Sequence, residues 1–288
     1  MDNSNVIIIG SGPAGISAAL YTARSNIKTT IISKKKGALA TAKEIENYYG
    51  FSQPISGPDL QQRGIDQAKR LGVEIIAQEV VGITDDENGF TVETSEGEYN
   101  AKVVILATGA SHTKPKWNNF SIYEGMGVSY CAVCDAFFFR EKDVAVVGNG
   151  SYALHEVKAL LPVVKSVTLC TDGQPPAEEF PPEVTVINKP VEALEGDTTL
   201  SAVRFKDGST LNTNALFVAI GTAGSSNLAN AIGAEVNNGN IVVDAFMNTT
   251  VPGLLAAGDC TMGMKQIAKA VYEGSLAGTE AIKIIREG

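Results

Sequence analysis

"NVIIIGSGPAGISAALYTARSNIKTTIIS", residues 5–33, is the stretch that decides the fold of this chain. An uninterrupted apolar run at residues 6–9 precedes a glycine turn, and apolar residues then recur at helical spacing before a second apolar run. Uninterrupted apolar runs are typical of strands that are buried on both faces of a parallel sheet. The stretch therefore predicts a strand, a helix and a parallel strand, the unit from which doubly wound sheets are built.

The turn in this unit has the spacing of a dinucleotide-binding loop, Gly10-x-Gly12-x-x-Gly15. The first glycine permits the tight turn, the second lets the backbone approach a pyrophosphate, and the third lets the helix pack closely on the strand. The helix N-terminus then offers unpaired amides to the phosphates. A glycine turn that serves packing alone is the alternative, and the position between strand and helix favours the nucleotide site.

A second unit of the same type occupies residues 142–170, "KDVAVVGNGSYALHEVKALLPVVKSVTLC", with Gly148-x-Gly150-x-x-Ala153 as its loop. The stretch that follows, "TDGQPPAEEFPPE" (171–183), contains four prolines, which exclude a normal crossover helix. An enzyme that selects NADPH usually places Arg or Lys after the second strand to bind the 2′-phosphate. There is no basic residue between Lys165 and Lys189, so the sequence does not support NADPH specificity.

Two more strand-and-turn segments divide the chain into domains: "KVVILATGAS" (102–111) and "ALFVAIGTAG" (215–224). Each unit takes one of them, and "LLAAGDC" (254–260) with a long helical stretch is left over. The simplest arrangement is an α/β chain with two Rossmann-like dinucleotide-binding domains, the second inserted in the first. We expect residues 1–113 and 244–288 to form the first domain and residues 114–243 the inserted one.

Composition excludes several classes of function. The 288 residues suffice for about two domains, and a net charge of −9 disfavours nucleic acid as a partner. The apolar runs are far shorter than the ~20 residues of a membrane span. The first residues, "MDNSN", lack the charged and apolar regions of a signal peptide, so we expect a cytoplasmic protein.

The cysteines point to redox chemistry and not to a metal. Cys131 and Cys134 form one CxxC, and neither a second CxxC nor a nearby pair of histidines is present to complete a zinc site. Two thiols at this spacing can close a short disulfide, and a helix beginning there would stabilise a thiolate. Asp135 follows directly and could exchange protons with the thiols if burial raised its pKa. A pair of buried thiols with a capping Asp is the structural alternative.

Seven motifs in order, "IIIGSGPAG", "IENYYG", "VVILATGAS", "CAVCDAFFF", "VAVVGNGSYALHE", "FVAIG" and "AAGDC", resemble the low-molecular-weight thioredoxin reductase family over essentially the whole chain. The resemblance implies an FAD domain built from both chain ends, an inserted domain that carries the disulfide and rotates to present it, and a homodimer. It implies that Cys134 lies next to the flavin, that Cys131 exchanges with the disulfide of thioredoxin, and that Asp135 is the acid/base.

The resemblance also implies residues that hold FAD. Gly10, Gly12 and Gly15 would hold the pyrophosphate, Asn47 would lie near the isoalloxazine, and Asp259 would bind the ribityl chain. Gln266 and Ile267 would approach the pyrimidine edge of the flavin.

Two departures from the family pattern bear on the flavin and on the electron donor. Lys36-Gly37-Ala38 replaces a common Gly-Gly-Gln, and Thr171-Asp172-Gly173 with the prolines replaces the His-Arg-Arg that grips the 2′-phosphate. The second departure is similar to a branch of the family that takes electrons from reduced ferredoxin. A flavin allows this, because it can accept single electrons and deliver a pair.

Ferredoxins are typically acidic, so docking would need a local basic patch. The candidates are residues 34–36 and Lys114 with Lys116 beside Trp117, although solvated surface lysines are the ordinary expectation. Phe137, Phe138 and Phe139 are expected in the core, Cys170 and Cys260 as small buried hydrophobic residues, and His112 and His155 in no catalytic role.

The leading hypothesis is a ferredoxin-dependent thioredoxin reductase. An NADH-dependent enzyme remains open, because Gly148, Gly150 and Ala153 are present and Asp172 lies one residue beyond the position that reads the ribose. A second flavin nucleotide in that pocket is a variant of this alternative. A non-catalytic flavin-binding redox sensor is the third possibility, which the intact CxxCD disfavours.

Overall fold

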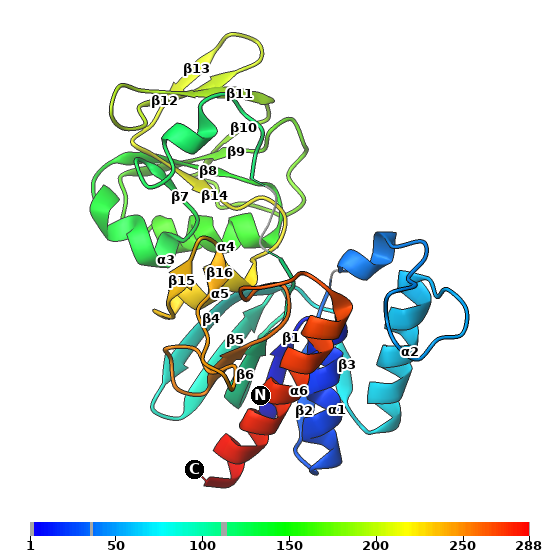
Figure 1. The fold of residues 1–288 in the computed structure, drawn as a ribbon. Coiled ribbons are helices and arrows are strands. Elements are labelled where there is room, and N and C mark those ends of the chain that lie inside the picture. The colour runs from blue at the N-terminus through cyan, green and yellow to red at the C-terminus, as the bar shows by residue number, and fades with distance from the viewer. Residues whose placement is uncertain (1–2, 35–36, 111–113, 288) are drawn as a thin grey trace. The chain divides into compact units, whose positions relative to one another are not determined.

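The computed structural model describes residues 3–34, 37–110 and 114–287, and the chain forms two compact units. The first unit contains Met1–His112 and Gly224–Gly288, and the inserted unit contains Thr113–Ala223. Figure 1 shows the two chain ends within the first unit. The predicted α/β class, with two Rossmann-like units and the second inserted in the first, is confirmed.

The first unit is built on a seven-stranded sheet of order β3-β2-β1-β6-β5-β4, with β17 also paired to β6. The pairs β1–β2 and β1–β6 are parallel and place Ile8 opposite Ile31 and Ile105. The strands are β1 (Asn3–Ile9), β2 (Thr29–Ile32), β3 (Glu74–Ile76), β4 (Val80–Asp86), β5 (Gly89–Thr94), β6 (Glu98–Leu106) and β17 (Leu254–Ala256), with β15 (Val236–Asn237) and β16 (Asn240–Ile241) as a separate pair.

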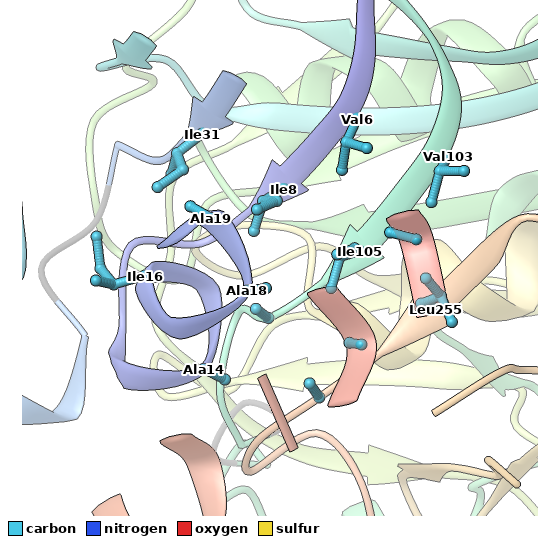
Figure 2. Packing of buried hydrophobic residues seen from close by; sticks show 14 of the residues in the cluster. Val6, Ile8, Ala14, Ile16, Ala18, Ala19, Ile31, Val103, Ile105 and Leu255 are labelled. Atoms are coloured by element: carbon cyan, nitrogen blue, oxygen red, sulfur yellow. The ribbon is translucent and has the colours of Figure 1, made fainter. Parts of the chain in front are cut away.

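The helices of the first unit cover this sheet and bury its apolar side chains. They are α1 (Pro13–Arg24), η1 (Ala38–Thr41), α2 (Gly57–Arg70), α5 (Ser225–Ala231) and α6 (Ile267–Glu287). Figure 2 shows Val6 and Ile8 of β1 with Val103 and Ile105 of β6, near small residues of α1 such as Ala18. The uninterrupted apolar runs at residues 6–9 and 103–106 are therefore interior strands of this sheet.

Helices α1 and α6 lie side by side, at a distance that only small residues allow (Figure 1). A Cβ added at Gly274 would lie 2.2 Å from the carbonyl oxygen of Ala14, and one at Gly278 would lie 2.7 Å from that of Ala18. Both neighbours are backbone atoms, which cannot rotate away. The helix that closes the chain is therefore held against the glycine-loop helix by backbone contact.

We expect Gly274→Leu to lower the free energy of unfolding by about 3 kcal/mol, because the side chain would force the two helices apart. Urea unfolding followed by circular dichroism measures the change. Thr279→Leu, at an exposed position of the same helix, is the control and should leave the stability nearly unchanged. Equal stability of the two variants would show that the helices separate without cost.

The second joint between the units lies at 223/224, and the prediction that it lies near residue 244 was wrong. Ser225, the first residue of α5, is tied to the first unit, because its hydroxyl lies 2.7 Å from that of Thr108 and its amide donates to the same Thr108 oxygen. Ile241 of β16 pairs with Thr261. Because α5 and the β15–β16 pair are short, their sequences contain no periodic pattern from which they could be predicted.

The inserted unit contains a parallel sheet of order β10-β9-β8-β14-β7 and an antiparallel sheet of order β11-β12-β13. Its strands are β7 (Val128–Ser129), β8 (Asp143–Val147), β9 (Ser166–Cys170), β10 (Thr185–Ile187), β11 (Val191–Glu195), β12 (Ala202–Phe205), β13 (Thr210–Asn212) and β14 (Ala215–Val218). Its helices are η2 (Phe120–Ile122), α3 (Ala132–Asp135), η3 (Ala136–Phe139) and α4 (Ser151–Leu160). No helix connects β9 to β10, as the four prolines predicted.

Within the described ranges, no helix combines the length and the apolar character that crossing a membrane requires.

Candidate functional site

The first glycine loop has the geometry of a phosphate cradle. Gly10 has φ +114°, and a Cβ there would lie 2.3 Å from the carbonyl oxygen of Ala107, so only glycine fits. A Cβ at Gly15 would lie 1.9 Å from the carbonyl oxygen of Gly10, whereas one at Gly12 would point into open space. Gly12 is the N-cap of α1, and no side chain caps this helix. The first-turn amides of α1 are therefore open to an anion.

The side-chain oxygen Oδ1 of Asp259 indicates a binding site for a ligand. Its Oδ1 is buried and has no hydrogen-bond partner among the residues that the structure describes. Burial raises the pKa of this carboxyl, and the nearby charges of Lys265 and Lys269 oppose the shift. Buried polar atoms are nearly always paired in folded proteins. A hydroxyl group of a bound molecule would supply the missing donor.

The loop that carries Asp259 is held by a buried polar network that sequence analysis missed. Glu273 of α6 accepts hydrogen bonds from the amide of Gly258 and the hydroxyl of Thr261, both at 2.8 Å. Lys269 lies 3.1 Å from the Glu273 carboxylate and donates to the Gly258 carbonyl. The signal was available, because Glu273 shares the buried face of α6 with Ala270 and Ala277.

Asn47 and Gln266, far apart in the sequence, meet in the first unit. Asn47 Nδ2 donates to Gln266 Oε1 at 2.9 Å, and both residues are exposed. Ile267 begins α6 beside Gln266 and packs against the buried cluster that includes Leu39 and Ile45. Three of the residues predicted to contact a flavin are thus brought together.

Cys134 and Asp135 lie in the single turn of α3, in the inserted unit, and Cys131 is the N-cap of that turn. Cys131 and Cys134 form the predicted disulfide, with Cα atoms 5.3 Å apart. Cys134 is exposed and Cys131 is buried. The Ser129 hydroxyl links Asp135 to the backbone of Cys131. It donates to Asp135 Oδ2 at 2.6 Å and accepts a hydrogen bond from the amide of Cys131 at 3.1 Å. A disulfide, a carboxylate and a hydroxyl therefore form one compact group.

Glu156 is a second carboxylate at this turn, and sequence analysis did not single it out. Its Oε2 accepts the amide of Ala132, between the two cysteines, at 2.6 Å. The residue is only 5% exposed, and burial raises its pKa to about 7. Its position on α4 gave a signal, because Ala153, Val157 and Leu160 on the same helical face are also buried.

The second glycine loop keeps its backbone geometry but is covered by the chain. Gly148 has φ +152°, and a Cβ at Gly150 would meet open space, as at Gly12. However, the hydroxyl of Ser151, at the start of α4, donates to Glu178 Oε1 at 2.6 Å. The amide of Ala177 donates to the carbonyl of Asn149 at 2.8 Å. A carboxylate thus lies at the helix start where a phosphate would bind.

Asp172 is engaged with the backbone and not placed to read a ribose. It has φ +49°, and its Oδ1 accepts the amide of Val191 at 2.6 Å. Thr171 beside it is buried and donates to Asn188. This geometry speaks against the NADH alternative, which relied on Asp172.

The structure describes three of the lysines considered for ferredoxin docking, and two of them form ion pairs. Lys34 lies 3.3 Å from Glu79, and Lys114 lies 2.7 Å from Glu124. Lys116 is exposed, and Lys35, Lys36 and His112 lie outside the described residues. These two ion pairs offset the charges of Lys34 and Lys114.

Two of the three phenylalanines after the disulfide are on the surface, so their predicted place in the core was wrong. Phe137 is 65% exposed and Phe138 is 68% exposed, while Phe139 packs edge-on against Phe217. The short helix η3 places them at successive positions around its axis, which cannot all face inward. Cys170 and Cys260 are buried as expected, and burial raises their pKa values to about 12 and about 11.

Comparison with known proteins identifies relatives over nearly the full chain. Residues 4–274 match the family model described as pyridine nucleotide-disulphide oxidoreductase. The thioredoxin reductase of Listeria innocua is 35% identical and that of Treponema pallidum 36%; each alignment covers 98% of this chain, with 94% and 97% of the relatives.

Two solved structures are also similar. The atypical thioredoxin reductase TRi from Desulfovibrio vulgaris Hildenborough has a TM-score of 0.91 and 39% identity, covering 99% of this chain and 98% of its own. A ferredoxin-flavin thioredoxin reductase from Clostridium acetobutylicum has a TM-score of 0.73 and 31% identity, covering 99% of both.

Proposed function

The chain belongs to the thioredoxin reductase family of pyridine nucleotide-disulphide oxidoreductases, and we propose that it reduces thioredoxin with electrons from ferredoxin and not from NADPH. It is an FAD-binding flavoprotein that acts on a disulfide. The identity of the donor, the disulfide substrate and the role of each residue are the proposal. The observation that carries the donor assignment is the Glu178 carboxylate at the second glycine loop.

The residues of the first unit fit FAD. Bound FAD would supply a centre that takes electrons singly or in pairs and delivers a pair to a disulfide. The open amides at the start of α1, framed by Gly10, Gly12 and Gly15, would hold the pyrophosphate. Asp259 Oδ1 would accept a ribityl hydroxyl, and Asn47 and Gln266 would hold the ring system together with Ile267.

The cysteines of α3 would carry the exchange with the substrate. After the S–S bond has taken up two electrons, the Cys131 thiolate attacks one sulfur of oxidised thioredoxin and expels the other as a thiolate. The Cys134 thiolate then attacks Cys131, which restores the internal disulfide and releases thioredoxin with two thiols. Asp135 gives and takes the protons. Since Cys131 is buried in this structure, the turn must become accessible before the first attack.

The surface beside the disulfide favours a protein substrate. Val133, Phe137 and Phe138 expose apolar side chains within a few residues of Cys134. The guanidinium carbon of Arg140 lies 4.8 Å from the centre of the Phe137 ring. Exposed aromatic groups with a cation are typical of contact surfaces for proteins. A small disulfide would not need this surface, whereas thioredoxin would. We also propose a homodimer, as the family resemblance implies.

The donor proposal rests on a difference between the two glycine loops in the acidic side chains that lie beside them. The first turns of α1 and α4 both lack acidic residues, so the loops differ in what the rest of the chain brings to them. At the second loop, Glu178 accepts a hydrogen bond from Ser151, and no basic residue lies between Lys165 and Lys189. Carboxylate repels phosphate, and NADPH carries three phosphate groups. Support for ferredoxin itself comes from the family resemblance and from the similarity to the ferredoxin-flavin enzyme.

We expect the protein to pass through a column of immobilised 2′,5′-ADP without being retained, because no basic residue lies between Lys165 and Lys189 to bind the 2′-phosphate. A protein with NADPH specificity would be retained and then released by NADP. Retention with release by NADP would contradict the donor proposal and leave the assignment of the disulfide untouched.

A further inference from the structure

Three peptide amides around the disulfide donate hydrogen bonds to three different acceptors. Ser129 Oγ accepts the amide of Cys131, Glu156 Oε2 accepts that of Ala132, and Cys131 Sγ accepts that of Cys134 at 3.2 Å. Amides at the start of a helix would otherwise stabilise a thiolate. Here the amide of Ala132 donates instead to the carboxylate of Glu156, which lies on α4.

The carboxylate is built into the unit. Glu156 lies in the middle of α4 on its buried face, so its side chain is held by the packing of that helix. The peptide that it binds joins Cys131 to Ala132, so the carboxylate contacts the backbone of the redox turn directly. A buried carboxylate is costly unless it serves a partner. The partner of Glu156 is the backbone of the CxxC turn.

We propose that Glu156 is a positioning residue of the redox centre: it holds the Cys131–Cys134 turn through the Ala132 amide and sets how readily the reduced thiols lose their protons. The role concerns the disulfide alone, so it holds whichever donor supplies the electrons.

Electrostatic repulsion explains how Glu156 alters the acidity of the two thiols. Reduction breaks the S–S bond and adds two electrons and two protons, which gives two thiols. The Cys131 thiol is buried, and when it loses its proton it becomes a thiolate at the turn whose Ala132 amide Glu156 accepts, so the two negative charges oppose one another. Because burial raises the Glu156 pKa to about 7, its charge changes near neutral pH and is coupled to the ionisation of the adjacent thiols. Glu156 therefore favours the protonated thiols.

Other titratable groups surround this site and must be considered in any titration. On α4 itself they are Tyr152, His155 and Lys158. On the elements packed against α4 they are Asp135 of α3, Asp143 of β8 and Cys170 of β9, and Glu178 lies next to Ser151. Asp135 is the nearest along the chain to the cysteines, and Ser129 donates to its carboxylate. A change that appears on altering Glu156 alone separates its contribution from theirs.

The test measures the acidity of the thiols in Glu156→Gln. The holoprotein is reduced with dithiothreitol, which is converted to its cyclic disulfide, and excess reagent is removed without oxygen. The rates at which iodoacetamide alkylates Cys131 and Cys134 are then measured by mass spectrometry from about pH 5 to about pH 10. Glutamine keeps an oxygen for the Ala132 amide and removes the charge. We expect the apparent pKa of the more acidic thiol to fall by about one unit.

Matched variants separate charge from position. Glu183→Gln, at an exposed residue of the same unit, should titrate like the wild type. Glu156→Ala removes the acceptor as well, so hydrogen exchange at the Ala132 amide should become faster than in Glu156→Gln. Flavin absorbance and far-ultraviolet circular dichroism verify that each variant is folded, and if the alanine variant does not fold, the glutamine variant decides. Wild-type thiol titration in Glu156→Gln would overturn the proposal.

Discussion

Cys131→Ser and Cys134→Ser will each abolish the reduction of thioredoxin, lowering kcat/KM by at least about a thousandfold. Each change removes one sulfur of the disulfide that α3 carries, and a hydroxyl cannot replace a thiol in disulfide exchange. The FAD content should stay at the wild-type level, because the residues that would hold FAD lie in the other unit. The two readouts are the rate of thioredoxin reduction and the flavin released by heat.

Cys170→Ala is the matched control for the serine variants. Cys170 is a buried thiol of β9 in the same unit and takes no part in the proposed exchange. Its replacement by alanine should preserve most of the activity. Substantial activity in Cys131→Ser would contradict the assigned exchange, and loss of FAD in that variant would contradict the separation of the two sites.

Gly12→Val will produce a folded protein without FAD. The added side chain points into open space, so the strand, the turn and α1 can form, but it occupies the position where a pyrophosphate would approach the backbone. The flavin-to-protein ratio should fall from about one to near zero, and reductase activity should disappear with it. Absorbance of the purified protein measures the ratio, and thermal unfolding verifies the fold.

Gly150→Val tests the second loop in the same way, because a Cβ at Gly150 also meets open space. If Glu178 has replaced a nucleotide at this loop, the variant should keep both its FAD and its ferredoxin-driven activity. Equal loss of FAD in the two variants would show that the second loop also binds the cofactor. Retention of FAD in Gly12→Val would contradict the proposed site.

Most of the fold was predictable because its interior strands are uninterrupted apolar runs. The run at residues 6–9 and the glycines after it permit few alternatives to a parallel strand followed by a helix. The joint at 223/224 was not predictable, because it depends on hydrogen bonds between Ser225 and Thr108, which are distant in sequence. The local sequence pattern does not indicate hydrogen bonds between residues so far apart in the chain.

The candidate site was predictable where its residues form motifs. The CxxC and the glycine loops have fixed spacing, so their positions on a turn and at helix starts followed directly. Glu156 and Glu178 carry no motif, and their roles arise only when the fold brings them to Ala132 and Ser151. The exposure of Phe137 and Phe138 was missed because apolar character alone does not distinguish a core from a contact surface.

Bleaching of the flavin by different donors in the absence of oxygen decides whether ferredoxin or a pyridine nucleotide supplies the electrons. NADPH, NADH and reduced ferredoxin are mixed separately with the holoprotein, flavin absorbance is followed, and oxidised thioredoxin is then added. We expect that reduced ferredoxin bleaches the flavin, that thioredoxin restores its absorbance, and that NADPH has no effect. Bleaching by NADH alone would support the NADH alternative. Rapid bleaching by NADPH at concentrations of about 10 μM would contradict the central claim.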